Sequence, residues 1–211
     1  MRSLLVTALA GFVLFLVLGN AVMLSVHGLA RQAADVSVEA PAGIRNFRQV
    51  NDHVWRGAAP STTGYKSLAA AGVSTIVDLR AEEDLHVNEA LLADLGVTRV
   101  ALPIRDGQAP PADTVRRFLQ VVKDSPGKVF VHCGAGVGRT GSMVAAYLVA
   151  TGQATPTQAI RHNLSVGPPS LEQVSYMATL ETDEFERPNA ALTAASRVLD
   201  APRRIWSRVN A

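Results

Sequence analysis

The sequence has little cysteine, few aromatic residues and little charge. Cys133 is the single cysteine among 211 residues, aromatic residues make up 5% and charged residues 18%. One cysteine excludes a scaffold of internal disulfides and a cysteine-based structural zinc site. Apolar residues reach 48%, which excludes a disordered or collagen-like chain. The length therefore predicts one folded domain with additional segments at its ends.

Acidic residues are missing from the N-terminal end. Residues 1–31 contain no Asp or Glu, and residues 187–211 contain arginines and a single acid, Asp200. The part between them has more acidic than basic residues. The sequence pI of about 9.0 therefore reflects the two ends, and we expect no nucleic-acid partner.

A long apolar run occupies residues 4–26, and nothing in it is more polar than threonine, asparagine and serine. As a helix it would cover about 35 Å, enough to span a bilayer core of roughly 30 Å. A cleaved secretory signal with a site near residues 28–30 is the alternative, but its apolar region would be shorter. We predict a retained single-pass membrane anchor at residues 1–30, followed by a linker at 31–43.

The rest of the sequence alternates between two hydrophobic patterns. Short β-branched runs predict strands, and apolar residues three or four positions apart predict helices. The expected strands are 54–56, 73–79, 97–102 and 128–132, and the expected helices are 62–72, 84–96, one beginning at residue 113, 138–151, 156–164 and 170–186. Alternating strands and helices favour parallel pairing. We predict an α/β fold, a mainly parallel central sheet with helices on both faces, preceded by one transmembrane helix.

A glycine-rich loop joins an expected strand to an expected helix. It runs His132-Cys-Gly-Ala-Gly-Val-Gly-Arg-Thr-Gly141. Such a loop at the carboxyl end of a strand can turn its N–H groups around one phosphate, and the following helix adds positive potential. The same field favours the thiolate form of Cys133, which makes it a nucleophile, and Arg139 can hold two phosphate oxygens. The predicted phosphate-binding residues are Gly134, Ala135, Gly136, Val137, Gly138 and Arg139.

This stretch resembles the His-Cys-x5-Arg-Thr-Gly signature of cysteine-dependent protein tyrosine phosphatases. The resemblance extends over the order of elements from about Phe47 to Glu186. Residues 46–50 and 54–60 look like the opening of bacterial members of the compact dual-specificity branch. The resemblance implies a phosphatase domain at residues 44–187, with His132 orienting the loop.

A proton donor for the leaving oxygen is expected on a neighbouring loop. Asp106 follows the expected strand 97–102, so it and Cys133 should lie at the same rim of the sheet. The segment Asp106-Gly-Gln-Ala-Pro110 is similar to the general-acid loop of small family members. Asp113 is the alternative acid, although its place at the start of the next helix also predicts a helix cap.

Three further predictions concern supporting residues. The Thr140 hydroxyl donates to the Cys133 sulfur or caps the first turn of its helix, and it can do both. Gln173 either positions the hydrolytic water or lies solvated on a helix surface. Arg56, Asp78 and Arg80 line the site or, as we favour, form salt bridges between elements. The histidines show no metal-ligand spacing, and we expect no metal and no cofactor.

Substrate and compartment follow from what the loop lacks. Relatives directed at phosphoinositides tend to carry lysines at the positions of Gly134, Ala135 and Val137, so their absence favours a phosphoprotein or a small aryl phosphate. A reactive thiolate without a second cysteine is better suited to a reducing compartment. This favours the cytoplasmic side of the membrane for the domain.

We therefore predict a membrane-anchored phosphatase in which Cys133, Arg139, Asp106 and Thr140 are catalytic. It would hydrolyse phosphotyrosine or phosphoserine and phosphothreonine in proteins through a cysteinyl-phosphate intermediate. The alternative is a membrane-tethered, non-catalytic phosphate-binding adaptor, and a rhodanese-like sulfurtransferase is the nearest enzymatic rival. The tail, 188–211, is expected to form a basic amphipathic helix broken near Pro202, which lies on a membrane, packs on the domain or frays. The sequence indicates no particular oligomeric state.

Overall fold

The computed structural model describes residues 2–32, 40–82 and 89–209 of the chain. A five-stranded sheet has the order β1-β2-β5-β3-β4. β2 (Val54–Ala58), β5 (Lys128–Cys133), β3 (Val73–Arg80) and β4 (Thr98–Ile104) run parallel, and the two-residue β1 (Arg48–Gln49) pairs antiparallel with β2 at the edge. This confirms the predicted α/β class with a mainly parallel sheet.

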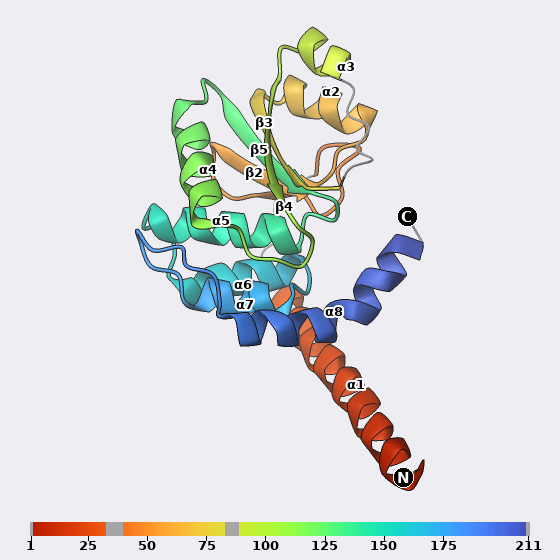
Figure 1. Cartoon of the computed structure of the whole chain (residues 1–211). Helices are drawn as coiled ribbons and strands as arrows, with labels where there is room; N and C mark the ends of the chain where they lie inside the picture. The colour runs from red at the N-terminus through yellow and green to blue at the C-terminus, as the bar shows by residue number, and fades with distance from the viewer. Residues whose placement is uncertain (1, 33–39, 83–88, 210–211) are drawn as a thin grey trace.

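Helices cover both faces of the sheet (Figure 1). α2 (Thr62–Ala70) and α3 (Glu89–Asp94) lie on one face, where Leu68 and Leu92 pack with Phe130 of β5. α4 (Ala112–Asp124) and α5 (Gly138–Ala150) lie on the other, where Phe118 and Met143 are fully buried. α6 (Pro156–Val166) and α7 (Leu171–Ala178) form a further layer against α5. Because successive strand residues point to opposite faces, β5 contributes to both cores.

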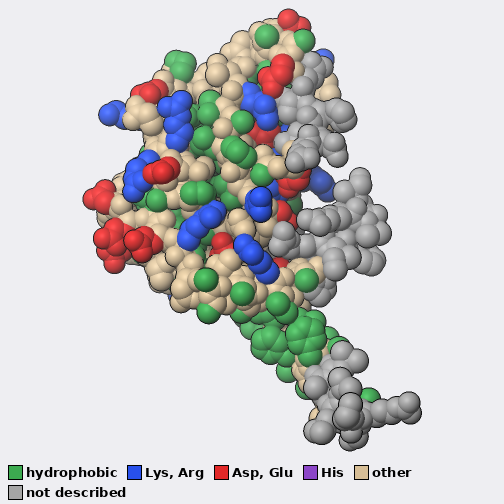
Figure 2. Space-filling model, viewed as in Figure 1, with side chains coloured by type: hydrophobic (Ala, Val, Ile, Leu, Met, Phe, Trp, Pro, Cys, Tyr) green, Lys and Arg blue, Asp and Glu red, His purple; other side chains and the backbone are tan. Residues whose placement is uncertain are grey.

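The first helix stands apart from the domain. α1 (Arg2–Gln32) projects from the globular part (Figure 1) and contacts it along α6, where His27 Nδ1 lies 2.5 Å from the Leu164 carbonyl oxygen. Figure 2 shows its apolar side chains gathered below a surface of mixed charge. The segment Ala10–Leu29 is long and apolar enough to cross a membrane, by length and composition. The predicted anchor therefore corresponds to one continuous helix.

Several predicted boundaries were wrong. The helix predicted over 170–186 ends at Ala178, and the C-cap residue Thr179 binds carbonyls of the last turn with its N–H and its hydroxyl. The tail was expected to break near Pro202, yet α8 (Ala190–Val209) is one helix, which changes direction part-way in Figure 1. Residues 84–88 of the predicted helix 84–96, and 33–39 of the linker, lie outside the described residues.

Phe118 is the best test of the larger core, because its buried ring packs edge-on against Tyr147 with centroids 6.2 Å apart. We predict that Phe118→Ala lowers the free energy of unfolding by about 3–5 kcal/mol, through lost burial and the cavity left behind. Arg117→Ala, at an exposed position on the same helix, should change it by less than about 0.5 kcal/mol. Chemical denaturation of the full chain in detergent measures both, and equal losses would contradict this account of the core.

Candidate active site

The loop from Cys133 to Arg139 lies between the end of β5 and the start of α5. Its carbonyl groups bind partners outside the loop. The Gly134 oxygen accepts from the Ala59 N–H at 3.1 Å, and the Ala135 oxygen accepts from the Asn46 side-chain amide at 2.9 Å. Because these carbonyls point outward, the intervening N–H groups are free to point inward.

Arg56 binds the next two carbonyl groups from the interior side. Its Nη2 donates to the Gly136 oxygen at 2.7 Å, to the Val137 oxygen at 3.3 Å and to the Asn163 side chain at 3.0 Å. Arg56 is fully buried on β2, and burial lowers its pKa to about 10. It forms no salt bridge with Asp78, contrary to our expectation, and instead supports the loop.

Gly136 occupies a position that only glycine can fill. Its φ of +72° is in the left-handed region, and a Cβ there would lie 2.2 Å from the carbonyl carbon of Gly57 on β2. The loop therefore packs directly on the neighbouring strand. Its N–H donates to the Cys133 sulfur at 3.3 Å, so this amide faces the predicted nucleophile.

Arg139 and Asp106 meet at the rim of this loop. Arg139 is buried, and its Nη1 lies 2.8 Å from a Glu82 carboxylate oxygen and 3.2 Å from the Ile104 carbonyl oxygen. Its Nη2 lies 3.5 Å from Asp106, which is half exposed. Burial alone would lower the pKa of Arg139, but the charges of Cys133, Asp106 and Glu82 raise it, so the guanidinium stays charged. Glu82 was missed by the sequence analysis.

His132 and Asp78 form the buried support of the loop. Burial lowers the pKa of His132 to about 4, and its Nδ1 donates to the Cys133 carbonyl at 3.2 Å. It lies 3.9 Å from Asp78, but a neutral ring makes this a polar contact rather than an ion pair. Burial would raise the pKa of Asp78, yet hydrogen bonds from Arg80 hold it well below its usual range. Asp78 forms salt bridges with Arg80 on its own strand β3 and with Arg99 on β4, so the bridge that joins two elements is to a residue that the sequence analysis did not name.

The remaining predicted residues take different places. Thr140 is buried, and its hydroxyl has no hydrogen-bond partner within the described part of the chain, so it does not bind Cys133 here. Gln173 is buried against Gly138, which excludes the solvated alternative. Its amide caps α7 through Ser170 and donates to the Gln108 carbonyl. Asp113 is 96% exposed and pairs with Arg116, away from the loop.

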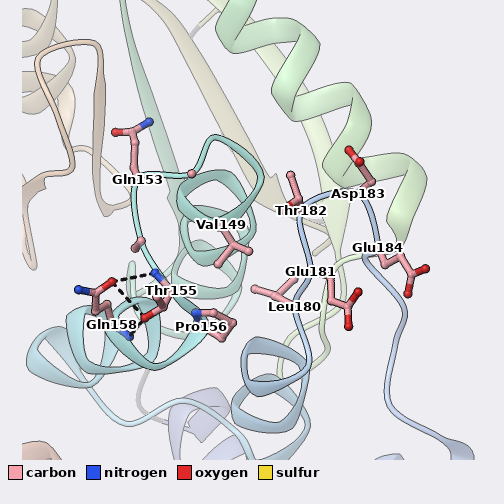
Figure 3. Close-up of a pocket in the computed structure, with 12 residues that line it drawn as sticks. Val149, Gln153, Thr155, Pro156, Gln158, Leu180, Glu181, Thr182, Asp183 and Glu184 are labelled. Atoms are coloured by element: carbon pink, nitrogen blue, oxygen red, sulfur yellow. Dashed lines mark hydrogen bonds between the residues drawn. The ribbon is translucent and has the colours of Figure 1, made fainter.

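A pocket of about 740 Å³ lies elsewhere, between the turn after α5 and the segment after α7 (Figure 3). Its walls include Val149, the capping pair Thr155 and Gln158, and Glu181, and they share no residue with the loop. Within the described ranges, no group of three His, Cys, Asp or Glu side chains could hold a metal ion.

A comparison of the sequence with models of known families places the chain in one of them. The model of the family described as "DSP-PTPase phosphatase fused to NAD+ Kinase" matches residues 36–179. The chain belongs to this DSP-PTPase family. The match includes the loop, Arg56, Asp106 and Gln173, and confirms the resemblance drawn from the sequence.

Individual relatives agree with this membership. The chain is 41% identical over 98 residues to probable NAD kinase 2, chloroplastic, of rice, covering 43% of this chain and 10% of that protein. It is 41% identical over 56 residues to human dual specificity protein phosphatase CDC14A, covering 26% of this chain and 9% of that one. The chain thus spans about a tenth of the length of these curated relatives. The catalytic domain of the yeast PP-IP phosphatase SIW14 shares the fold, with a TM-score of 0.59, 18% identity and coverage of 77% and 98%.

Gly141 tests the support of the loop in this DSP-PTPase domain. A Cβ at Gly141 would lie 1.8 Å from the Asn163 side-chain oxygen, the acceptor for Arg56. We predict that Gly141→Ala lowers the free energy of unfolding by about 1–3 kcal/mol, because Asn163 must move. Gly28→Ala, where a Cβ meets nothing, is the helical control and should not lower it. In a double-mutant cycle, Asn163→Ala should remove most of the effect of Gly141→Ala, and strict additivity would contradict the proposed clash.

His132 gives the stability of the domain a defined pH dependence. With a pKa of about 4 when folded and 6.5 when unfolded, the unfolded chain binds the proton first as pH falls. The free energy of unfolding should therefore drop by about 3 kcal/mol between pH 6.5 and pH 4 through this group. His162, whose pKa burial also lowers to about 4, adds to the same window. Denaturation at several pH values should show a shallower slope for His132→Asn than for the wild type, and unchanged slopes would contradict a buried neutral His132.

Proposed function

We propose that the chain hydrolyses phosphate monoesters through a covalent cysteinyl-phosphate intermediate. The observation that carries this is the geometry of the loop. The carbonyl groups of residues 134–137 accept hydrogen bonds from residues that are not part of the loop. The Gly136 N–H faces the Cys133 sulfur, and Arg139 is the last residue of the loop. Such an arrangement stabilises three phosphoryl oxygens as charge develops on them.

In the first step the Cys133 thiolate attacks phosphorus, so that a P–S bond forms as the P–O bond to the leaving group breaks. Asp106, beside Arg139 at the rim, gives its proton to the leaving oxygen. In the second step water attacks phosphorus and loses a proton to Asp106, and the P–S bond breaks. Thr140, with its buried hydroxyl one residue after Arg139, is assigned to stabilise the departing thiolate.

In this proposal Gln173 positions a loop and does not take part in the chemistry. Its amide oxygen accepts from the Ser170 N–H, and its amide nitrogen donates to the Gln108 carbonyl. Both polar ends are thus engaged by protein, and its side chain lies against Gly138. We assign it to fixing the acid loop against the phosphate loop rather than to placing the hydrolytic water.

The proposed substrate is a phosphorylated protein side chain. Gly134, Ala135 and Val137 place no cation around the loop for a second phosphate, and a cradle for one phosphate suits a monoester. The match to a dual specificity protein phosphatase points in the same direction. We further propose that α1 anchors the domain to a membrane with the site on the reducing, cytoplasmic side.

The mechanism is tested with the full chain in detergent under reducing conditions. Cys133→Ser should abolish hydrolysis of aryl phosphates. Asp106→Asn should slow phenyl phosphate, which has a poor leaving group, by about 100-fold or more, and p-nitrophenyl phosphate by less. Asp113→Asn is the matched control for the alternative acid and should keep wild-type rates.

Two results would change the proposal. A loss of activity in Asp113→Asn but not in Asp106→Asn would move the acid to α4. A wild-type chain that binds phosphate or phosphopeptide without turnover would favour the adaptor. Loss of phosphate binding in Arg139→Ala would then locate that function in the same loop.

A further inference from the structure

We propose that Arg187 and Ser196, which lie beyond the part of the chain that matches the family, position the acid loop of residues 105–111. This inference rests on the proposed function, because it assigns a role relative to Asp106. The two residues would make the segment after α7 and the helix α8 part of the catalytic scaffold rather than a separate tail.

Arg187 acts on the backbone of Ala109, three residues after Asp106. Its Nε and Nη2 donate to the Ala109 carbonyl at 3.0 and 2.6 Å. The N–H of the same residue donates to the Glu172 carboxylate at 3.0 Å. Ala109 is completely buried, so both its polar groups depend on these side chains for hydrogen bonds.

The two preceding residues of the loop are held in the same way. The Ser170 hydroxyl donates to the Gly107 carbonyl at 2.7 Å, and the Gln173 amide donates to the Gln108 carbonyl at 3.1 Å. Three successive loop residues therefore take hydrogen bonds from one structural unit, the N-terminus of α7 together with Arg187. Fixing this backbone limits where the Asp106 carboxylate can lie.

α8 in turn fixes the N-terminus of α7. The Glu172 N–H, in the first turn, has no acceptor within its own helix because of its position. It donates instead to the Ser196 hydroxyl oxygen of α8 at 2.9 Å, and that hydroxyl donates to Asp200. Ser196 is nearly fully buried. A cap supplied by α8 therefore holds Glu172 where its side chain reaches Ala109.

The test compares Arg187→Gln and Ser196→Ala with Arg197→Gln, a change at an exposed position of α8, in the full chain. A displaced acid predicts that kcat for phenyl phosphate falls roughly tenfold in both variants with little change in KM, and falls less for p-nitrophenyl phosphate. Arg197→Gln should behave as wild type.

Hydrogen exchange supplies a second readout that needs no turnover. The amides of residues 107–109 should exchange faster in both variants, whereas those of α5 should not change. Equal exchange and equal leaving-group dependence in variants and wild type would overturn the inference. Faster exchange throughout α5 as well would show that the substitutions lower the stability of the whole domain, and this too would overturn the inference. An inactive wild type would overturn the proposed function and the acid-positioning role. Hydrogen exchange would still decide whether Arg187 and Ser196 hold the loop of residues 105–111.

Discussion

The site depends on the outward binding of the carbonyl groups between Cys133 and Val137. A peptide unit has its N–H opposite its C=O, so holding the carbonyls outside directs the amides to the centre. These carbonyls accept hydrogen bonds from Arg56 on β2, from the residue that follows β2, from the segment before β1 and from His132 at the end of β5. The anion-binding property of the loop is thus produced by tertiary structure, not by its glycines alone.

Among these partners, Arg56 is the charged side chain that is fully buried. Transfer of a guanidinium into a fully buried position is costly unless its donors are used. Within the described residues, no carboxylate forms a salt bridge with it, and its Nε and Nη1 have no hydrogen-bond partner. The nearby Cys133 raises the pKa of Arg56, which burial alone would lower further.

The sequence was sufficient to predict the sheet class, the place of the loop and the order of the elements. These depend on local patterns, namely β-branched runs, apolar spacing and glycine placement. Asp106 was predicted to lie near the Cys133 loop on the rule that parallel strands end at one rim, and the structure places its carboxylate 3.5 Å from Arg139 of that loop. The rule did not reveal Asn46, Glu82 or Asn163, because their contacts join residues far apart in sequence.

The contacts of Arg56 could not be predicted from the residues around it in the sequence. We expected it to form a salt bridge, and nothing in its own sequence neighbourhood indicates that it binds a loop 80 residues later. Gly141 offers a signal that could have been used. A glycine within a helix lowers its stability relative to alanine, so its presence there indicates that another group approaches the backbone closely. At Gly141 that group is the Asn163 side chain. Asn163 in turn accepts a hydrogen bond from Arg56, which binds the loop carbonyls. The glycine therefore lowers the stability of the helix but allows the contact that holds the loop.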